Sequence, residues 1–378
     1  MGGMNLRLPR PPAIRAPLHD PRTATVIGRL LGVAILVCFA TGLVSHYLQE
    51  PPARLSGWLP TRPVWGYRVT QGAHVISGIA AIPLLLAKLW TVYPRLLVWP
   101  PVRSVAHALE RLSIAVLVAA TLLEVSMGLL NTAQWYPWPF SFRAVHWALA
   151  WVIVGSLLLH LAVKAPVVAG HWRAPREPSV DGPDRRSLLI GMGFAVGTVT
   201  AVTAGQSVTV LKNLTLLAPR HPDHGPQGLP VNRTARAAHV RRDELADWRL
   251  TVSGPRPYSL SLAELRALPQ HAATLPIACV EGWSKTAHWE GVRIRDLLAR
   301  AGVPDGARLR VVSLQRGGAY RVTELDRPYS RDDLTLLALR LNREVLSLDH
   351  GFPARIIAPN RPGVLQTKWV SRLEVLDA

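Results

Sequence analysis

The sequence predicts a multi-domain membrane protein in which an all-α part with five transmembrane helices precedes an α+β domain rich in β-strands. Five long apolar runs crowd the first 208 residues, and each is long enough to cross a bilayer. From residue 232 onward, short runs of alternating apolar and polar residues are separated by turn residues, which is typical of strands. The composition agrees, because 49% of the 378 residues are hydrophobic and only 18% are charged.

Six segments are expected along the chain. They are a basic cytoplasmic arm (1–24), a four-helix bundle (25–170), a cytoplasmic loop (171–187), a fifth span (188–208), a linker rich in proline, glycine and histidine (209–231) and the β-rich domain (232–378). The spans of the bundle are expected at about 25–47, 70–92, 107–131 and 143–165. In the last segment, SLAELRAL and RIRDLLARAG predict helices, whereas DWRLTVSG, RLRVVSLQ, ARIIAP and WVSRLEVL predict strands.

Lysine and arginine set the expected orientation. They gather in the N-terminal arm and in the second and fourth connections, whereas the third connection, NTAQWYPWPFSF, is uncharged and aromatic. Basic connections stay in the cytoplasm and aromatic residues favour the interface. Arginines in the first connection weaken this asymmetry without reversing it. The N-terminus is therefore expected in the cytoplasm and residues 209–378 on the extracytoplasmic side of the plasma (inner) membrane.

Two arginines, Arg185 and Arg186, stand just before the fifth apolar run. A twin arginine before a modest apolar stretch resembles a Tat signal, and ordinary positive-inside flanking is the alternative. The Tat pathway exports folded proteins, which suits a domain that is loaded with a cofactor before export.

Charge and cysteine content exclude other classes. The net charge of +19 could indicate nucleic-acid binding, but the basic residues lie largely between the apolar runs, so membrane topology explains them. The two cysteines, Cys38 and Cys279, lie in different segments, which argues against a disulfide framework. A single cysteine without a CxxC pair also argues against a cysteine-rich zinc or iron–sulfur site in the last domain.

Histidines inside the apolar runs predict two haems. His146 and His160 are fourteen residues apart, so on a helix they share one face and lie about 21 Å apart along its axis. Neutral imidazole is a haem-iron ligand, and histidine within a span is costly unless it has a function. A hydrogen-bonded interfacial histidine is the alternative for any one of them alone.

Ligand pairs follow from depth in the bilayer. His74 with His146 is the expected outer pair and His107 with His160 the expected inner pair. His46 could replace His74, and His19 could replace His107. This layout over residues 25–165 resembles the four-helix, b-type cytochrome family that includes cytochrome b561. The resemblance implies two haem b groups.

Two further ionisable residues lie at membrane depth, Lys88 in the second span and Glu124 in the third. They could form a proton path or a quinone site. A structural ion pair and snorkelling side chains are the alternatives.

The string LPIACVEGWSKTAHWEGVRIRDLL, residues 275–298, contains the most informative cysteine. Cys279 follows a β-like run and precedes a turn, where a thiolate could bind a transition metal or act as a nucleophile. His288 is nine residues on, with no oxyanion signature, so no catalytic dyad is evident. The alternative is a buried cysteine with a structural role only.

This string resembles the sulfite oxidase-type molybdopterin domain, and within that family the methionine sulfoxide reductase catalytic subunits of the MsrP type. The shared features are Cys-Val-Glu-x-Trp-Ser, a later Trp-x-Gly and a following LL helix. Upstream, LPVNRTARAAHV resembles the Asn-Arg segment, and LDHGFPARIIAPNRPGVLQTKWVSRLEVL resembles the C-terminal ending.

The resemblance implies a cofactor and its ligands. Cys279 would be the thiolate on molybdenum. The residues that would hold the pterin and its phosphate are Asn232, Arg233, His350, Arg355 and Lys368, helped by backbone N–H groups of the PNRPG turn. Tyr320 is a candidate for the open position of the metal, with a core or surface tyrosine as the alternative. Arg316, Arg321 and Arg361 could form an anion pocket.

These observations predict a membrane-bound molybdenum-cofactor oxidoreductase. It would transfer an oxygen atom to or from a small-molecule substrate at an extracytoplasmic site. It would exchange electrons through two haems with the quinone pool or another carrier. The alternative is a haem-containing membrane anchor whose outer domain binds a ligand or partner without catalysis.

Overall fold

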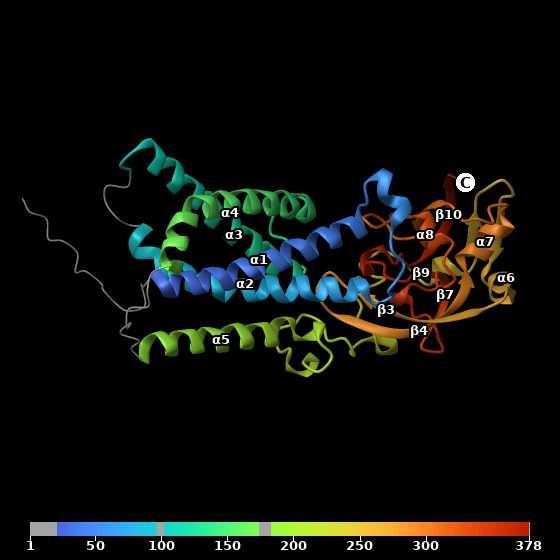
Figure 1. The fold of residues 1–378 in the computed structure, drawn as a ribbon. Helices are drawn as coiled ribbons and strands as arrows, with labels where there is room; N and C mark the ends of the chain where they lie inside the picture. Colours follow the sequence, from blue (N-terminus) through green and yellow to red (C-terminus); the bar gives the residue numbers. More distant parts are fainter. Residues whose placement is uncertain (1–20, 97–101, 174–182, 378) are drawn as a thin grey trace, which may run out of the picture. The chain divides into compact units, whose positions relative to one another are not determined.

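The computed structural model of the chain describes residues 21–96, 102–173 and 183–377. In the first part, the described residues form five long helices, whose order can be followed in Figure 1. They are α1 (Pro21–Gln49), α2 (Gly66–Leu96), α3 (Val105–Thr132), α4 (Phe142–Arg173) and α5 (Pro183–Ala204). All five are long and apolar enough to cross a membrane, which confirms the five predicted spans.

The helices are longer than their apolar runs, most of all α2 and α4. α2 begins at Gly66 rather than near residue 70, and α4 continues to Arg173 rather than ending near residue 165. Apolar residues mark only the lipid-covered length, whereas backbone hydrogen bonding continues into the polar interface. Large apolar side chains remain exposed on the helices, among them Leu36 at 66% and Phe194 at 75%. Lipid tails would cover such side chains.

The boundary between the two compact units of the chain runs through the helices. The first unit contains the described residues up to Ile35, together with Ala80–Met127 and Phe140–Val199. The second contains Leu36–Ile79, Gly128–Pro139 and Thr200–Ala378. The second half of α1 and the first half of α2 therefore belong to the same unit as the β-rich domain, which the predicted segment boundaries did not anticipate.

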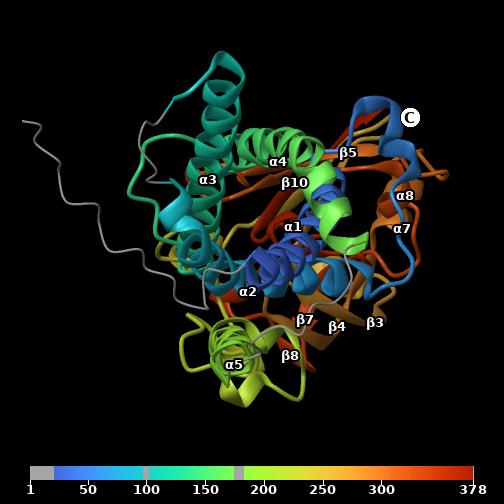
Figure 2. The ribbon, with the colours of Figure 1, turned by 60° about the vertical axis from the view of Figure 1, so that its left-hand side comes forward.

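Helices in the first unit pack through a small apolar cluster. Ile27 of α1, Leu84 of α2 and Met192 of α5 are buried against one another. Figure 2 shows α3 and α4 from another side. Between these two helices, Glu124 contacts His146, and Glu110 forms an ion pair with Lys164. His19 lies outside the described residues.

Ten strands build the described part of the β-rich domain. They are β1 (Arg249–Val252), β2 (Tyr258–Ser261), β3 (His271–Ala278), β4 (Ser284–Arg293), β5 (Arg308–Ser313), β6 (Val322–Leu325), β7 (Leu336–Leu341), β8 (Glu344–Val345), β9 (Arg355–Ile357) and β10 (Val370–Asp377). One sheet has the order β2-β1-β10-β5-β6, and the other has the order β3-β4-β7-β8, with β9 also paired to β7. Only β1 and β10 pair in parallel within these sheets. The predicted strands correspond to β1, β5, β9 and β10.

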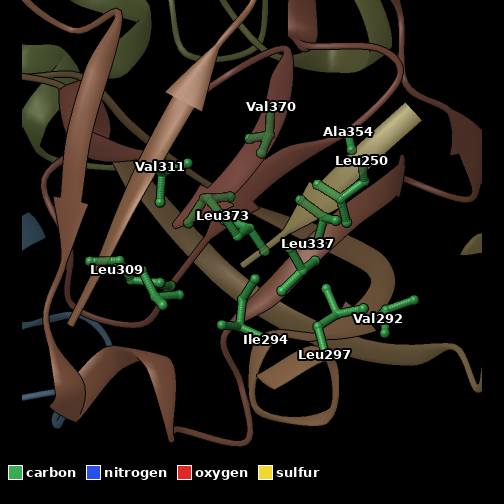
Figure 3. Packing of buried hydrophobic residues seen from close by; sticks show 14 of the residues in the cluster. Leu250, Val292, Ile294, Leu297, Leu309, Val311, Leu337, Ala354, Val370 and Leu373 are labelled. Atoms are coloured by element: carbon green, nitrogen blue, oxygen red, sulfur yellow. The ribbon is translucent and has the colours of Figure 1, made fainter. Parts of the chain in front are cut away.

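The two sheets share one apolar core, which Figure 3 shows from close by. Leu250 and Leu373 of the first sheet face Leu337 of the second, and Leu297 closes the same cluster. The predicted helices are α6 (Leu262–Ala267) and α7 (Ile294–Arg300), and a further short helix is α8 (Arg327–Ser330). α6 starts at a capping box, because the Ser261 side chain accepts from Glu264 N–H and the Glu264 carboxylate accepts from Ser261 N–H.

Short 3₁₀ helices occupy several connections. They are η2 (Ala53–Trp58), η3 (Gly205–Ser207), η4 (Lys212–Leu214), η5 (Pro226–Gly228), η6 (Asp243–Leu245), η7 (Leu348–His350) and η8 (Gly363–Leu365). The predicted linker is held by ion pairs, since Asp223 contacts both Lys212 and Lys285. Hydrogen bonds from these two lysines lower the pKa of Asp223 to about 2. The linker is therefore anchored to the start of β4.

Candidate functional site

Cys279 lies at the end of β3, in a tight turn that leads to β4. We call residues Cys279–Trp283 the Cys279 turn. Cys279 N–H donates to Trp283 O at 2.9 Å, and Gly282 N–H donates to Cys279 O at 3.1 Å. Gly282 has φ +96°, a conformation that residues with a Cβ adopt only with strain. The last strand pair, Ala278 with Ser284, thus delivers the thiol to a fixed position.

Asn232 contacts the thiol directly. Its Nδ2 donates to Cys279 Sγ at 2.7 Å, while the Cys279 side chain is only 1% exposed. Burial raises the pKa of the Cys279 thiol, and the charge of Glu281 raises it further. Without a bound cation the cysteine is therefore a protonated thiol, and a metal ion would have to displace the proton. The structure brings together these two predicted residues, which are 47 positions apart.

A buried ion pair lies beside the thiol. Glu281 is fully buried, accepts from Arg220 Nη1 at 2.8 Å and accepts from Trp283 Nε1 at 3.1 Å. Arg220 also donates to Val231 O at 3.1 Å, so it joins the Cys279 turn to the segment that precedes Asn232. Sequence reasoning missed this pair. Glu281 stood in the informative CVEGWS string, but nothing marked Arg220 within the linker.

Three tyrosines interact electrostatically with the Cys279 thiol or with one another. Tyr67 interacts with Cys279 and Tyr320, and Tyr136 interacts with Glu281, Tyr320 and Cys279. Burial first, and then the charge of Glu281, raise the pKa of Tyr136. Tyr320 was predicted, whereas Tyr67 and Tyr136 come from the start of α2 and from the connection between α3 and α4. Sequence reasoning missed both, because they belonged to the membrane part of the chain.

A cluster of positive charges lies next to Asn232. Lys368 Nζ donates to Arg233 O at 2.7 Å and to Asp349 O at 2.8 Å. Burial lowers the pKa of Lys368 to about 7, and the charges of Arg355 and Arg233 act in the same direction. The negative charge of Asp349 raises the pKa of Lys368 and offsets these effects only in part. A cavity of about 550 Å³ adjoins this cluster and is lined by basic side chains, including Arg236, with Asp349.

Two predicted pterin ligands bind backbone carbonyls inside the domain. His350 Nε2 donates to Pro226 O at 2.8 Å, and Arg355 Nη1 donates to His350 O at 3.1 Å. Gly351 has φ +111°, and a Cβ there would lie 3.0 Å from Lys368 Cβ and 3.1 Å from Arg355 Cβ. The glycine therefore lets the strand with Arg355 approach the segment with Lys368.

The structure gives no support to the predicted anion pocket of three arginines. Arg361 is 3% exposed, donates to Leu365 O and lies over the Tyr329 ring at 5.0 Å. Arg316 instead forms a surface ion pair with Glu244 at 2.7 Å. The hydrogen bond and the ring contact of Arg361 therefore lie inside the domain. The described contacts of Arg321 do not join it to Arg316 or Arg361.

The outer histidine of α2 is held by α1. His74 Nδ1 donates to Cys38 O at 2.8 Å, so in the neutral ring the lone pair is on Nε2. This arrangement is common among histidines that bind metal through Nε2. A Cβ at Gly42 would lie 3.1 Å from His74 Cε1, so a glycine there lets α1 approach the ring. His46, the other candidate, lies in the last turn of α1.

The remaining predicted haem ligands lie in the first unit. His146 Nδ1 lies 3.1 Å from Glu124 Oε1. Lys88 Nζ donates to Ala24 O at 2.6 Å, so this lysine and Glu124 have different contacts. His160 and His107 both interact electrostatically with Glu110.

One hydrogen bond does not favour the predicted inner pair. His107 Nδ1 accepts from Arg103 N–H at 3.3 Å, which leaves the proton of a neutral ring on Nε2. The pairing of His74 with His146 joins residues of different units. Both pairings stay predictions.

Comparisons with known proteins identify the second part of the chain. Residues 237–378 match the family model of the oxidoreductase molybdopterin binding domain. The uncharacterized oxidoreductase YuiH of Bacillus subtilis is 30% identical over 135 residues, which cover 35% of this chain and 67% of YuiH. This chain belongs to the molybdopterin-binding oxidoreductases. The predicted enzyme class is thereby confirmed.

Other relatives extend the comparison. The putative protein-methionine-sulfoxide reductase subunit YedZ1 of Azospira oryzae is 30% identical over 212 residues, 51% of this oxidoreductase and 79% of YedZ1. That share is larger than residues 237–378, so the likeness includes part of the chain before them. The mitochondrial sulfite oxidase of Drosophila melanogaster is 33% identical over 160 residues, 35% of this chain. The chain spans only 27% of that relative's length.

Among solved structures, the sulfane dehydrogenase SoxCD of Paracoccus pantotrophus is 26% identical and has a TM-score of 0.32. The match covers 35% of this oxidoreductase and 39% of the SoxCD chain. A TM-score this low adds nothing to the assignment.

The residues present fit a molybdenum cofactor. Three buried polar atoms in the site have no hydrogen-bond partner among the described residues: Asn232 Oδ1, Arg233 Nε and Arg355 Nε. Buried polar groups are normally satisfied, so these atoms indicate a polar ligand. The buried cations around Lys368 favour an anion such as the pterin phosphate, and the sulfur of Cys279 is a soft metal ligand.

The depressed pKa of His350 predicts a loss of stability in acid. Burial, followed by the charge of Arg355, lowers its pKa from 6.5 to about 4. Between these values the unfolded chain binds more protons, so stability falls as the pH falls, by about 3 kcal/mol in all. Urea unfolding of the cofactor-free chain, followed by tryptophan fluorescence at pH 7 and pH 4, measures this loss. The loss should shrink in His350→Gln and persist in His224→Gln, an exposed control. An equal loss in His350→Gln would contradict the assignment.

Proposed function

We propose that this oxidoreductase transfers an oxygen atom at an extracytoplasmic molybdenum site and exchanges electrons through two b haems with the quinone pool or another carrier. The observation that carries the proposal is the contact of Asn232 with the Cys279 thiol, next in the chain to Arg233, whose carbonyl oxygen accepts a hydrogen bond from Lys368. A soft sulfur ligand beside an anion site is the arrangement that a molybdenum ion with a phosphate-bearing pterin requires.

Each residue has a distinct role in this proposal. Cys279 binds the metal, and Asn232 orients its sulfur. Lys368 and Arg233 would hold the pterin phosphate, while Arg355 and His350 would support the site through their hydrogen bonds to backbone carbonyls. When bound, the cofactor supplies two-electron oxygen-atom transfer. The protein excludes water from the thiol and keeps the buried Arg220–Glu281 pair next to it.

Tyr320 is assigned to the substrate side of the metal. Its electrostatic interactions with Tyr67 and Tyr136, which also interact with Cys279, support a place near the thiol. The names of the relatives, sulfite oxidase and protein-methionine-sulfoxide reductase subunit, favour a substrate whose oxygen is carried by sulfur.

Haem b supplies the one-electron steps in the membrane part. The hydrogen bond from His74 Nδ1 to Cys38 O supports His74 as a ligand, and His146, His107 and His160 are the further ligands that the sequence indicates. The basic flank of α5, which contains Arg185 and Arg186, supports export of the folded domain. Glu124, placed against His146, is then a ligand-orienting group rather than part of a quinone site.

The first prediction of this proposal concerns haem content. His160→Ala should lose one of two haems, because an imidazole ligand to the inner iron is removed. Pyridine haemochrome analysis of the purified chain gives the ratio. His271→Ala, in the β-rich domain, is the control and should keep both haems. Two haems in His160→Ala would disprove the ligand assignment.

The second prediction concerns export. Replacing both Arg185 and Arg186 with lysine should leave the first four spans inserted but keep the β-rich domain in the cytoplasm, because Tat recognition depends on the twin arginine. Protease added to spheroplasts measures the accessibility of the domain. Arg103→Lys is the control and should leave it accessible. Normal accessibility in the double variant would refute the Tat assignment.

The third prediction concerns the metal ligand. Cys279→Ser should fold, export and keep both haems, but substrate-driven haem oxidation or reduction should fall to background, because oxygen is a harder ligand than sulfur. Molybdenum EPR and haem absorbance are recorded on the same sample. Cys38→Ser, at the other cysteine, should keep the molybdenum signal. Wild-type spectra and turnover in Cys279→Ser would end the molybdenum assignment.

A further inference from the structure

A glutamine on α2 contacts the Cys279 turn. Gln71 Nε2 donates to Val280 O, the carbonyl directly after Cys279, at 3.1 Å. Gln71 is 4% exposed, and its Oε1 accepts from Ser45 Oγ at 2.9 Å and from Tyr67 OH at 3.2 Å. All hydrogen-bonding groups of this amide except one N–H are thus engaged by α1, α2 and the turn. A buried amide so fully used fixes the position of the groups that it joins.

A second contact lies one turn further along α2. A Cβ at Gly282 would lie 3.1 Å from Val75 Cγ1 and 3.0 Å from Ser207 Oγ, so the turn lies directly against the helix. Ser207 Oγ also donates to Gly282 O at 2.8 Å. The two residues of α2 that touch the turn, Gln71 and Val75, flank His74. All of these residues belong to the second unit.

We infer that Gln71 is a positioning residue that couples the Cys279 turn to the histidine-bearing helix and sets the rate of electron exchange between the two. This inference rests on the proposed function, because it takes Cys279 as the molybdenum ligand and His74 as a haem ligand. It adds a residue whose contacts are made to neither cofactor.

Gln71 would affect the rate because electron tunnelling is slowed when its path crosses a gap between atoms that are neither bonded nor hydrogen-bonded. From Cys279, covalent bonds lead to Val280 O, one hydrogen bond crosses to Gln71, and covalent bonds of α2 lead on to His74. If this hydrogen bond is replaced by an apolar contact, the path contains a van der Waals gap and the turn loses its tether. Two electrons per oxygen atom pass one at a time, so each turnover uses the same contact twice.

The test compares Gln71→Leu with wild-type protein, using the full-length chain. In the loaded protein, we expect the rate of intramolecular electron exchange, measured after flash reduction of haem, to fall at least tenfold. The molybdenum EPR signal and haem midpoint potentials should stay unchanged, which a general structural defect would not allow. In the cofactor-free chain, amide hydrogen exchange at residues 280–284 should become faster.

Two further variants sharpen the test. Within α1, Gln49 Nε2 donates to Ser45 Oγ at 3.0 Å. Gln49→Leu is therefore the matched control and should keep wild-type exchange rates. Tyr67→Phe removes one hydrogen bond to Gln71 Oε1 and should give an intermediate rate.

The outcomes separate the two levels of the proposal. If wild-type protein exchanges electrons between both cofactors and Gln71→Leu does so at the same rate, Gln71 has no such role while the proposed function stands. Unchanged amide exchange at the turn in Gln71→Leu would equally overturn the inference. If wild-type protein lacks either cofactor, or does not exchange electrons between them, the proposed function fails and the inference fails with it.

Discussion

The site depends on the hydrogen bond that closes the Cys279 turn, from Cys279 N–H to Trp283 O. It ends β3 and starts β4 within five residues, which needs the positive φ of Gly282. Because the turn is this short, the Cys279 thiol, the Glu281 carboxylate and the Trp283 indole project from adjacent positions into one buried region. Asn232, Arg220 and Gln71 each contact a different side of it.

The positive charges in this region favour the binding of an anion. Burial disfavours the charges of Arg355 and Lys368, and it lowers the pKa of Arg355 to about 10 and that of Lys368 to about 7. A protein does not normally assemble buried cations without an anion to balance them. Binding of a phosphate there would restore the charge on Lys368 and relieve the mutual repulsion. The cofactor would thus contribute to the stability of the domain as well as to its chemistry.

Local patterns predicted the elements and the chemistry, but not the contacts between distant segments. Apolar length revealed the five spans, and alternation revealed β1, β5, β9 and β10, because both signals lie within a few residues. Cys279 and Asn232 stood in strings that resemble a known family. Arg220, Tyr67 and Gln71 were missed since each acts through tertiary contacts that no local pattern records. The start of the β-rich domain at residue 232 was predicted from its short alternating runs, but that local pattern does not register that the end of α1 and the start of α2 pack with the sheets.

That packing has a consequence for how the molecule is assembled. Tyr67 N–H donates to Asn360 Oδ1, across 293 positions of sequence, and Leu48, Leu59 and Tyr67 are buried in the same cluster as Leu250 and Leu373. The β-rich domain therefore completes its interior with residues that are synthesised long before it. A domain that crosses the membrane folded would cross with this apolar surface uncovered. Its final folding step would be docking onto helices that are already in the bilayer, so membrane insertion of α1 and α2 would have to precede completion of the domain.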